Sequence, residues 1–164
     1  SWSSRQAASG DEVLLLAKVM LEDVQYEDEQ GQGRWSAEVK QFADALDEIG
    51  ACISRSHARA PGPRFLVERL PMGLAISHDG MATVYSYSNA HVEWFHGIKR
   101  MYLPRYPRFA TASGRGPSLE DKVERFLTGL GFRCVFVDNS FEQYSKYGNG
   151  SLHCLSKVLL RGNY

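Results

Sequence analysis

Apolar residues recur every three to four positions in the first third of the chain, a spacing typical of amphipathic helices. In residues 11–28 these positions are Val13, Leu14, Leu16, Ala17, Met20, Leu21 and Val24. After the breaker GQG, Ser36 is a candidate N-cap, and Gly50 is a candidate stop signal. The apolar positions between them are Val39, Phe42, Leu46 and Ile49. The pattern predicts two helices, followed by a short strand over ACIS.

The rest of the chain alternates strand and helix signals. GLAIS and ATVYSYS read as two strands joined by the turn signal HDG. Ser118, with Asp121 three residues on, forms a near capping box for a helix that runs to Gly131. FRCVFVD and HCLSKVLL are the last predicted strands. This order of elements indicates a mixed α/β (α+β) fold with mixed sheets and short helices.

Composition narrows the classes of partner. The chain has 164 residues, enough for one domain, which we expect over residues 11–164, with residues 1–10 as a flexible edge. Nineteen basic and 19 acidic residues give no net charge, which argues against nucleic acid or an anionic membrane as partner. The longest apolar run, VLLLA, is too short to cross a bilayer. No signal peptide is recognisable near the start.

The three cysteines predict a free thiol rather than a metal site. No C-x-x-C spacing occurs, and an odd number cannot pair completely within the chain. Cys154 follows a glycine-flanked turn at the start of an apolar run, where a side chain is held rigidly. We expect Cys154 to be the most reactive thiol, and Cys52 and Cys134 to be buried within strands. His153 would face the other side of the strand, so the base must come from elsewhere.

Residues 116–161 resemble the C-terminal end of the protein-arginine deiminases, members of the guanidine-modifying (pentein) superfamily. That family ends in an L-E-x-K-V helix, a G-L-x-C-x-F strand and a G-x-x-H-C-x-[ST] element. The matching residues here are Leu119, Glu120, Lys122, Val123, Gly129, Leu130, Cys134, Phe136, Gly150, His153, Cys154 and Ser156. The resemblance implies that Cys154 is the nucleophile.

Two further signatures of that family have counterparts. Its G-H-V-D-E-F segment is similar to AHVEWF, which implies His91 as catalytic base and acid and Glu93 as a substrate carboxylate. Its W-x-x-D segment is matched more loosely by Phe65 and Glu68. Both family aspartates are glutamates here, one methylene longer. Deimination needs one cysteine, one histidine and two acids. The two carboxylates orient the planar guanidinium while the thiolate attacks its carbon.

The resemblance also implies the fold and the ligands. We expect a reduced pentein-like αβ propeller that has lost at least one repeat, because the chain is short for five units. The expected reaction is deimination of arginine to citrulline through a covalent thiouronium on cysteine, with peptidyl arginine as the favoured substrate. No cofactor is required by this chemistry, calcium dependence is open, and an arginine-containing protein or small guanidine would be the substrate. The small size fits a soluble effector or toxin domain, secreted or delivered.

Two other interpretations stay open. A papain-like thiol hydrolase or deamidase would use the same Cys154 and His91, although those folds usually place the cysteine early and on a helix. A non-enzymatic module could keep the fold after losing repeats. The segment KRMYLPRYPRF mixes cations with aromatics, and with zero net charge we interpret it as a substrate rim or a face for a protein partner or inhibitor. His57, His78 and His96 read as solvent-exposed or turn residues.

Overall fold

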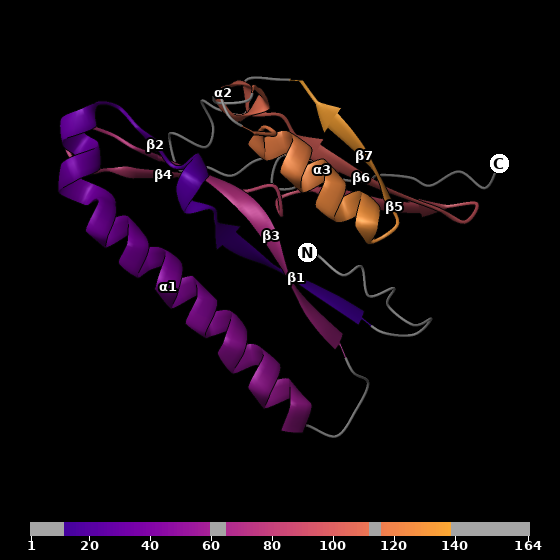
Figure 1. Ribbon diagram of the computed structural model, residues 1–164. Helices are drawn as coiled ribbons and strands as arrows, with labels where there is room; N and C mark the ends of the chain where they lie inside the picture. The colour runs from indigo at the N-terminus through magenta and orange to yellow at the C-terminus, as the bar shows by residue number, and fades with distance from the viewer. Residues whose placement is uncertain (1–11, 60–64, 112–115, 139–164) are drawn as a thin grey trace.

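The computed structural model describes residues 12–59, 65–111 and 116–138. It is a mixed α+β structure with two sheets and few helices, as the sequence predicts (Figure 1). The elements follow in the order β1 (Glu12–Val19), η1 (Leu21–Asp23), β2 (Gln25–Tyr26), α1 (Glu29–Arg59), β3 (Phe65–Ile76), β4 (Ala82–Tyr85), β5 (His91–Phe95), β6 (Ile98–Pro104), α2 (Pro107–Ala110), α3 (Leu119–Gly129) and β7 (Phe132–Val137).

The first sheet is built around the long strand β3. Strand β1 pairs with the first part of β3 in parallel, and β2 pairs in parallel with Ala75 and Ile76 near its end. Strand β4 pairs antiparallel with residues 73–76 of β3. This range includes the two residues that pair with β2, so β2 and β4 lie on opposite edges of β3. The predicted hairpin over HDG is therefore confirmed, with Gly80 at a φ of 85° in its turn.

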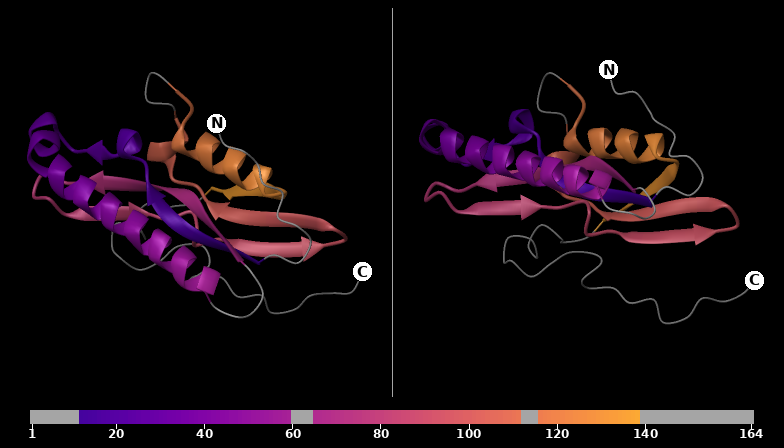
Figure 2. Two further views of the ribbon diagram at one scale, coloured as in Figure 1. Left: turned by 60° about the horizontal axis from the view of Figure 1, so that its bottom comes forward. Right: turned by 90° about the horizontal axis from the view of Figure 1, so that it is seen from below.

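The second sheet has the order β5-β6-β7, with β5 antiparallel and β7 parallel to β6. The crossover between β6 and β7 contains α3, which begins with the capping box expected at Ser118: its Oγ accepts the Asp121 N–H at 3.1 Å, and Asp121 Oδ2 accepts the Ser118 N–H at 2.9 Å. The β5–β6 and β3–β4 hairpins extend toward opposite ends of the molecule (Figure 2).

Two apolar clusters hold the sheets and helices together. Alternate residues of β3, namely Met72, Leu74 and Ile76, pack with Val39 and Ala43 of α1. The other cluster joins the second face of β3 to β6, α2 and α3. Its members include Ala75, Tyr85, Tyr87, Met101, Leu103, Tyr106, Phe109, Val123 and Leu127. Strand β3 is therefore buried on both faces, without interruption from Leu70 to Ile76.

In the N-terminal half, the structure differs from the elements that the sequence predicts. Residues 12–19 form strand β1 rather than a helix, because they pair with β3 along their whole length. An apolar run of this length does not separate a buried strand from a helix by periodicity. The helix expected from Ser36 to Gly50 is real but runs from Glu29 to Arg59, through the GQG breaker and through ACIS, so the expected strand there is wrong. With 31 residues, α1 is not a short helix.

Gly50 lies inside α1, where the absence of a side chain leaves room for Arg69. A Cβ at Gly50 would lie 2.2 Å from Arg69 Nη1. The Arg69 guanidinium donates to the carbonyls of Leu46 at 3.0 Å and Ala17 at 2.9 Å, and it pairs with Asp47 at 2.8 Å. The glycine therefore serves close approach between α1 and β3 and does not end the helix.

Candidate functional site

Strands β5 and β6 bring His91 and Glu93 to one face of the second sheet. The hairpin turns at His96 and Gly97, with φ of 48° and 75°, the left-handed conformation that suits a two-residue hairpin loop. In the resulting register His91 lies opposite Tyr102 and Glu93 opposite Arg100. Because side chains two apart on a strand share a face, these four residues form one cross-strand group.

Glu93 binds a guanidinium on this face. Its Oε2 accepts from Arg100 Nη1 at 3.0 Å and from the Tyr102 hydroxyl at 3.1 Å. The Glu93 side chain is 36% exposed and that of Arg100 28%, so water screens the ion pair only in part. Burial and the contact with Glu93 both raise the pKa of Tyr102. The ring of His91 lies beside Tyr102, with centroids 6.4 Å apart.

The other two residues expected at the substrate site lie in the first sheet. Phe65 and Glu68 belong to β3, where they are paired with Glu12 and Leu15 of β1. Glu68 is half-buried. The structure therefore places His91 and Glu93 together on β5, whereas the looser pair comes from a different sheet. A pocket that contains both glutamates stays a prediction.

Cys154 lies outside the described residues, as does the strand predicted over HCLSKVLL. The expected meeting of its sulfur with the His91 imidazole is therefore still a prediction. The two other cysteines can be placed. Cys134 lies in a strand, β7, as predicted, but it is half-buried rather than buried. Cys52 is exposed on α1, so its prediction as a buried strand residue is wrong. The reason is that ACIS continues the helix, and Cys52 lies on its outer side near Glu48 and Arg55.

We expect Cys52 to react with iodoacetamide at least about tenfold faster than Cys134 in the native protein. Burial raises the pKa of Cys134 to about 11, which leaves little thiolate at pH 8, and the thiolate is the reacting form. Brief alkylation followed by peptide mass spectrometry measures both rates. Faster labelling of Cys134 would contradict the placement of these two thiols.

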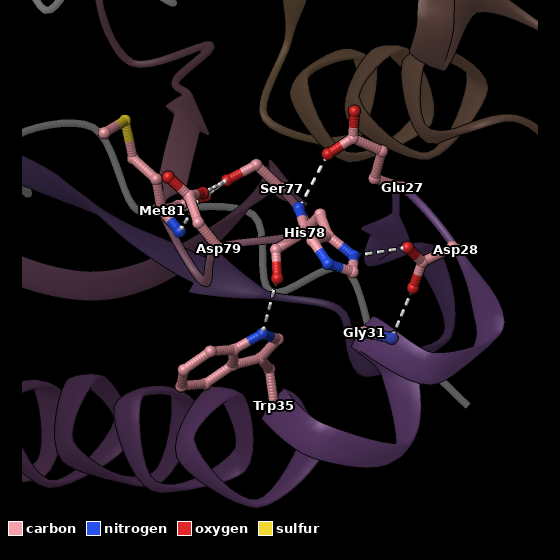
Figure 3. Close-up of polar contacts among 8 residues, drawn as sticks. All are labelled: Glu27, Asp28, Gly31, Trp35, Ser77, His78, Asp79 and Met81. Carbon is pink, nitrogen blue, oxygen red and sulfur yellow. Dashed lines mark hydrogen bonds and ion pairs between the residues drawn. The ribbon is translucent and has the colours of Figure 1, made fainter.

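A second polar cluster, which the sequence does not indicate as a site, joins the β3–β4 turn to the start of α1 (Figure 3). His78 Nδ1 lies 2.7 Å from Asp28 Oδ2, and Glu27 Oε2 accepts the His78 N–H at 2.6 Å. Asp28 Oδ1 accepts the Gly31 N–H, a bond that lowers the pKa of Asp28, as does its contact with His78. No local sequence signal indicates this cluster, because it depends on the parallel pairing of β2 with β3, which brings the residues that follow the two strands to one edge.

This cluster fixes a turn and does not form a nucleophilic triad among the described residues. The Ser77 hydroxyl donates to Asp79 and lies 3.1 Å from the Met81 carbonyl oxygen, so it is directed within its own turn rather than to the imidazole. Trp35 of α1 donates its indole N–H to the His78 carbonyl at 3.5 Å. A Cβ at Gly80 would lie 2.5 Å from the Trp35 ring. These contacts tie the hairpin turn to α1.

The described parts of the chain contain neither a group of metal-ligating side chains nor a helix that could span a membrane. No group of three or more His, Cys, Asp or Glu side chains there could hold a metal ion. None of the helices in those residues is both long and apolar enough to cross a bilayer. His91 and Glu93 are the two candidate site residues that the structure brings together on one strand.

Comparison with known proteins does not assign a family. No family model matches this chain, and neither a curated protein nor a solved structure matches it.

Proposed function

We propose that this protein is an arginine deiminase-type guanidino hydrolase of reduced pentein-like architecture, with Cys154 as nucleophile and His91 and Glu93 as its partners. One observation carries the proposal: Glu93 holds a guanidinium, that of Arg100, on the face that it shares with His91. A carboxylate and a hydroxyl that orient a planar cation beside an imidazole are what deimination requires of a substrate site.

The proposed reaction uses the thiol, the imidazole and water. The Cys154 thiolate attacks the guanidinium carbon and forms a C–S bond, and His91 protonates the departing nitrogen, which leaves as ammonia. His91 then takes a proton from water as the water attacks the thiouronium carbon. The C–S bond breaks, the thiolate returns, the remaining hydroxyl proton passes to solvent, and the product carries a ureido group, as in citrulline. Glu93 holds the two remaining nitrogens of the substrate in plane during both steps.

Arg100 restricts how a substrate guanidinium can bind to Glu93. It occupies the carboxylate oxygen that a substrate guanidinium would use, so a substrate must share Glu93 with Arg100 or displace it. An arginine-containing protein or a small guanidine compound is the proposed substrate, and a secreted or delivered effector domain is the proposed setting.

Replacing Glu93 by glutamine is expected to lower kcat/KM for arginine substrates by on the order of a hundredfold, because a hydrogen bond between charged groups is lost. Turnover is measured on free arginine and an arginine peptide, with and without calcium. The readouts are ammonia release and the mass gain of about one unit when N–H becomes O. The matched control is Glu124→Gln on the exposed side of α3, which should leave turnover unchanged. Unchanged turnover after Glu93→Gln, or no turnover of any guanidine by the unaltered protein, would contradict the proposal.

A further inference from the structure

A hollow of about 290 Å³ lies at the end of the first sheet, away from the His91–Glu93 group. Its floor is a row of three side chains on adjacent strands, Gln25 of β2, Ala75 of β3 and Thr83 of β4, which lie opposite one another in the register. Arg108 of α2 and Tyr85 of β4 line it too, as do Glu27 and Ser77. The hollow is on the face of β3 that does not pack against α1, because Met72, Leu74 and Ile76 fill the other face.

The hollow exists because small residues follow one another on this face of β3. At the first of them, Gly73, the Phe109 ring covers the sheet so closely that a Cβ would lie 2.6 Å from its Cε2 atom. Ala75 comes two residues later on the same face, and its methyl group is too small to fill the space between Gln25 and Thr83. A volume of this size holds on the order of ten waters, or a ligand of about as many heavy atoms.

Groups of opposite charge line the two ends of the hollow. Arg108 extends over the Tyr85 ring, with its guanidinium carbon 5.2 Å from the ring centroid, at the Gly73 end. Glu27 follows β2 at the Ser77 end, where its own N–H donates to the Ile76 carbonyl at 3.0 Å. Rows on one face of a strand are about 7 Å apart, so the two ends are separated by roughly two rows.

The polar groups around the hollow are held in place by other contacts. Glu27 uses Oε2 to accept the His78 N–H at 2.6 Å, and a carboxylate can accept further hydrogen bonds at its other lone pairs. The Gln25 amide donates to the Arg108 carbonyl at 2.7 Å, which joins α2 to the floor. Arg108 carries five N–H donors on a planar group, so it can bind a carboxylate while it keeps its other contacts.

We propose that this hollow binds a small zwitterion, a molecule with a carboxylate at one end and a basic nitrogen several bonds away at the other. The carboxylate is bound by Arg108 and the basic nitrogen by Glu27, with the chain between them over Ala75 and beside the Thr83 hydroxyl. A simple anion or a simple cation satisfies only one end. The site is independent of the proposed deiminase reaction, because His91 and Glu93 lie on the second sheet.

The test uses ε-aminocaproate, whose nine or so heavy atoms suit this volume, beside caproate and hexylamine, which each lack one of its charges. Calorimetric titration is expected to show saturable binding of ε-aminocaproate at millimolar concentration or tighter. Caproate and hexylamine should each bind on the order of tenfold to a hundredfold more weakly, since each loses one charged contact.

Variants of the protein assign each charge to its end of the ligand. Arg108→Gln should weaken the binding of ε-aminocaproate and of caproate and leave the weak binding of hexylamine unchanged. Glu27→Gln should weaken the binding of ε-aminocaproate and of hexylamine and leave that of caproate unchanged. Ala75→Leu fills the hollow and should abolish binding of all three, with circular dichroism and melting temperature as the check on folding. Arg125→Gln on α3 is the control, because Arg125 is exposed and does not line the hollow. Absence of saturable binding to the unaltered protein, or equal affinity after both Arg108→Gln and Glu27→Gln, would overturn the proposal.

Discussion

Replacing Gly73 by alanine is expected to destabilise the protein by about 1–3 kcal/mol, because the added methyl group overpacks the core. The new Cβ would lie 2.6 Å from Cε2 and 2.8 Å from Cζ of Phe109. Phe109 is only 3% exposed, and its ring packs against Tyr85 at a centroid distance of 5.2 Å, so it has little room to move. For a chain of this length, the melting temperature should fall by roughly 2–4 °C per kcal/mol.

Gly33→Ala is the matched control, and it should change stability in the opposite direction. Gly33 lies inside α1 with no heavy atom near the position of an added Cβ. Alanine there is expected to stabilise the helix by about 0.5–1 kcal/mol. A smaller residue at Phe109 should partly rescue Gly73→Ala, because the two side chains compete for one space. Equal stability of Gly73→Ala and the unaltered protein in urea unfolding would show that Phe109 does not cover β3 in this way.

Replacing Cys154 by alanine is expected to abolish deimination, with a loss in kcat of at least about a thousandfold. The reason is chemical: without the thiolate, no covalent thiouronium forms, and water alone must attack a guanidinium carbon whose charge is spread over three nitrogens. Turnover is followed by ammonia release, and a haloacetamidine should add to the unaltered protein at Cys154 and be detected by peptide mass spectrometry.

Cys52→Ala is the control for this substitution. Cys52 is exposed on α1, so its loss should leave both turnover and melting temperature unchanged. Cys154→Ala should also melt at nearly the same temperature as the unaltered protein, which separates a chemical defect from unfolding. Turnover that survives Cys154→Ala would rule out this residue as the nucleophile. Cleavage of amides by the unaltered protein, without change to guanidines, would favour the papain-like alternative.

The elements that the sequence predicted correctly are those determined by short-range signals. The turn at HDG needs a residue that accepts positive φ, and Gly80 provides it within a few residues of both strands. The capping box at Ser118 and Asp121 needs only the two side chains and the backbone between them. Strand β7, over FRCVFVD, follows Gly131, whose φ of 84° ends the helix before it.

The elements that the sequence did not predict correctly depend on contacts between residues that are far apart in the chain. Residues 12–19 have apolar side chains that suit a helix or a buried strand, and pairing with β3, more than 50 positions away, decided for the strand. Gly50 stays inside α1, where the lack of a Cβ leaves room for Arg69, although glycine often marks a helix end. Neither contact can be inferred from neighbouring residues, because each joins segments that are far apart in the sequence.

For the candidate sites, the sequence by itself determined residue types and local spacing, and the tertiary structure decided which of them meet. The separation of His91 and Glu93 by two positions already implies a common face if the segment is a strand, because side chains alternate along a strand. That Arg100 would occupy the Glu93 carboxylate, that Phe65 and Glu68 would lie in another sheet, and that Asp28 would reach His78 all depended on strand register. Register is set by the packing of whole faces against helices, a property of long-range burial that no short stretch of sequence contains.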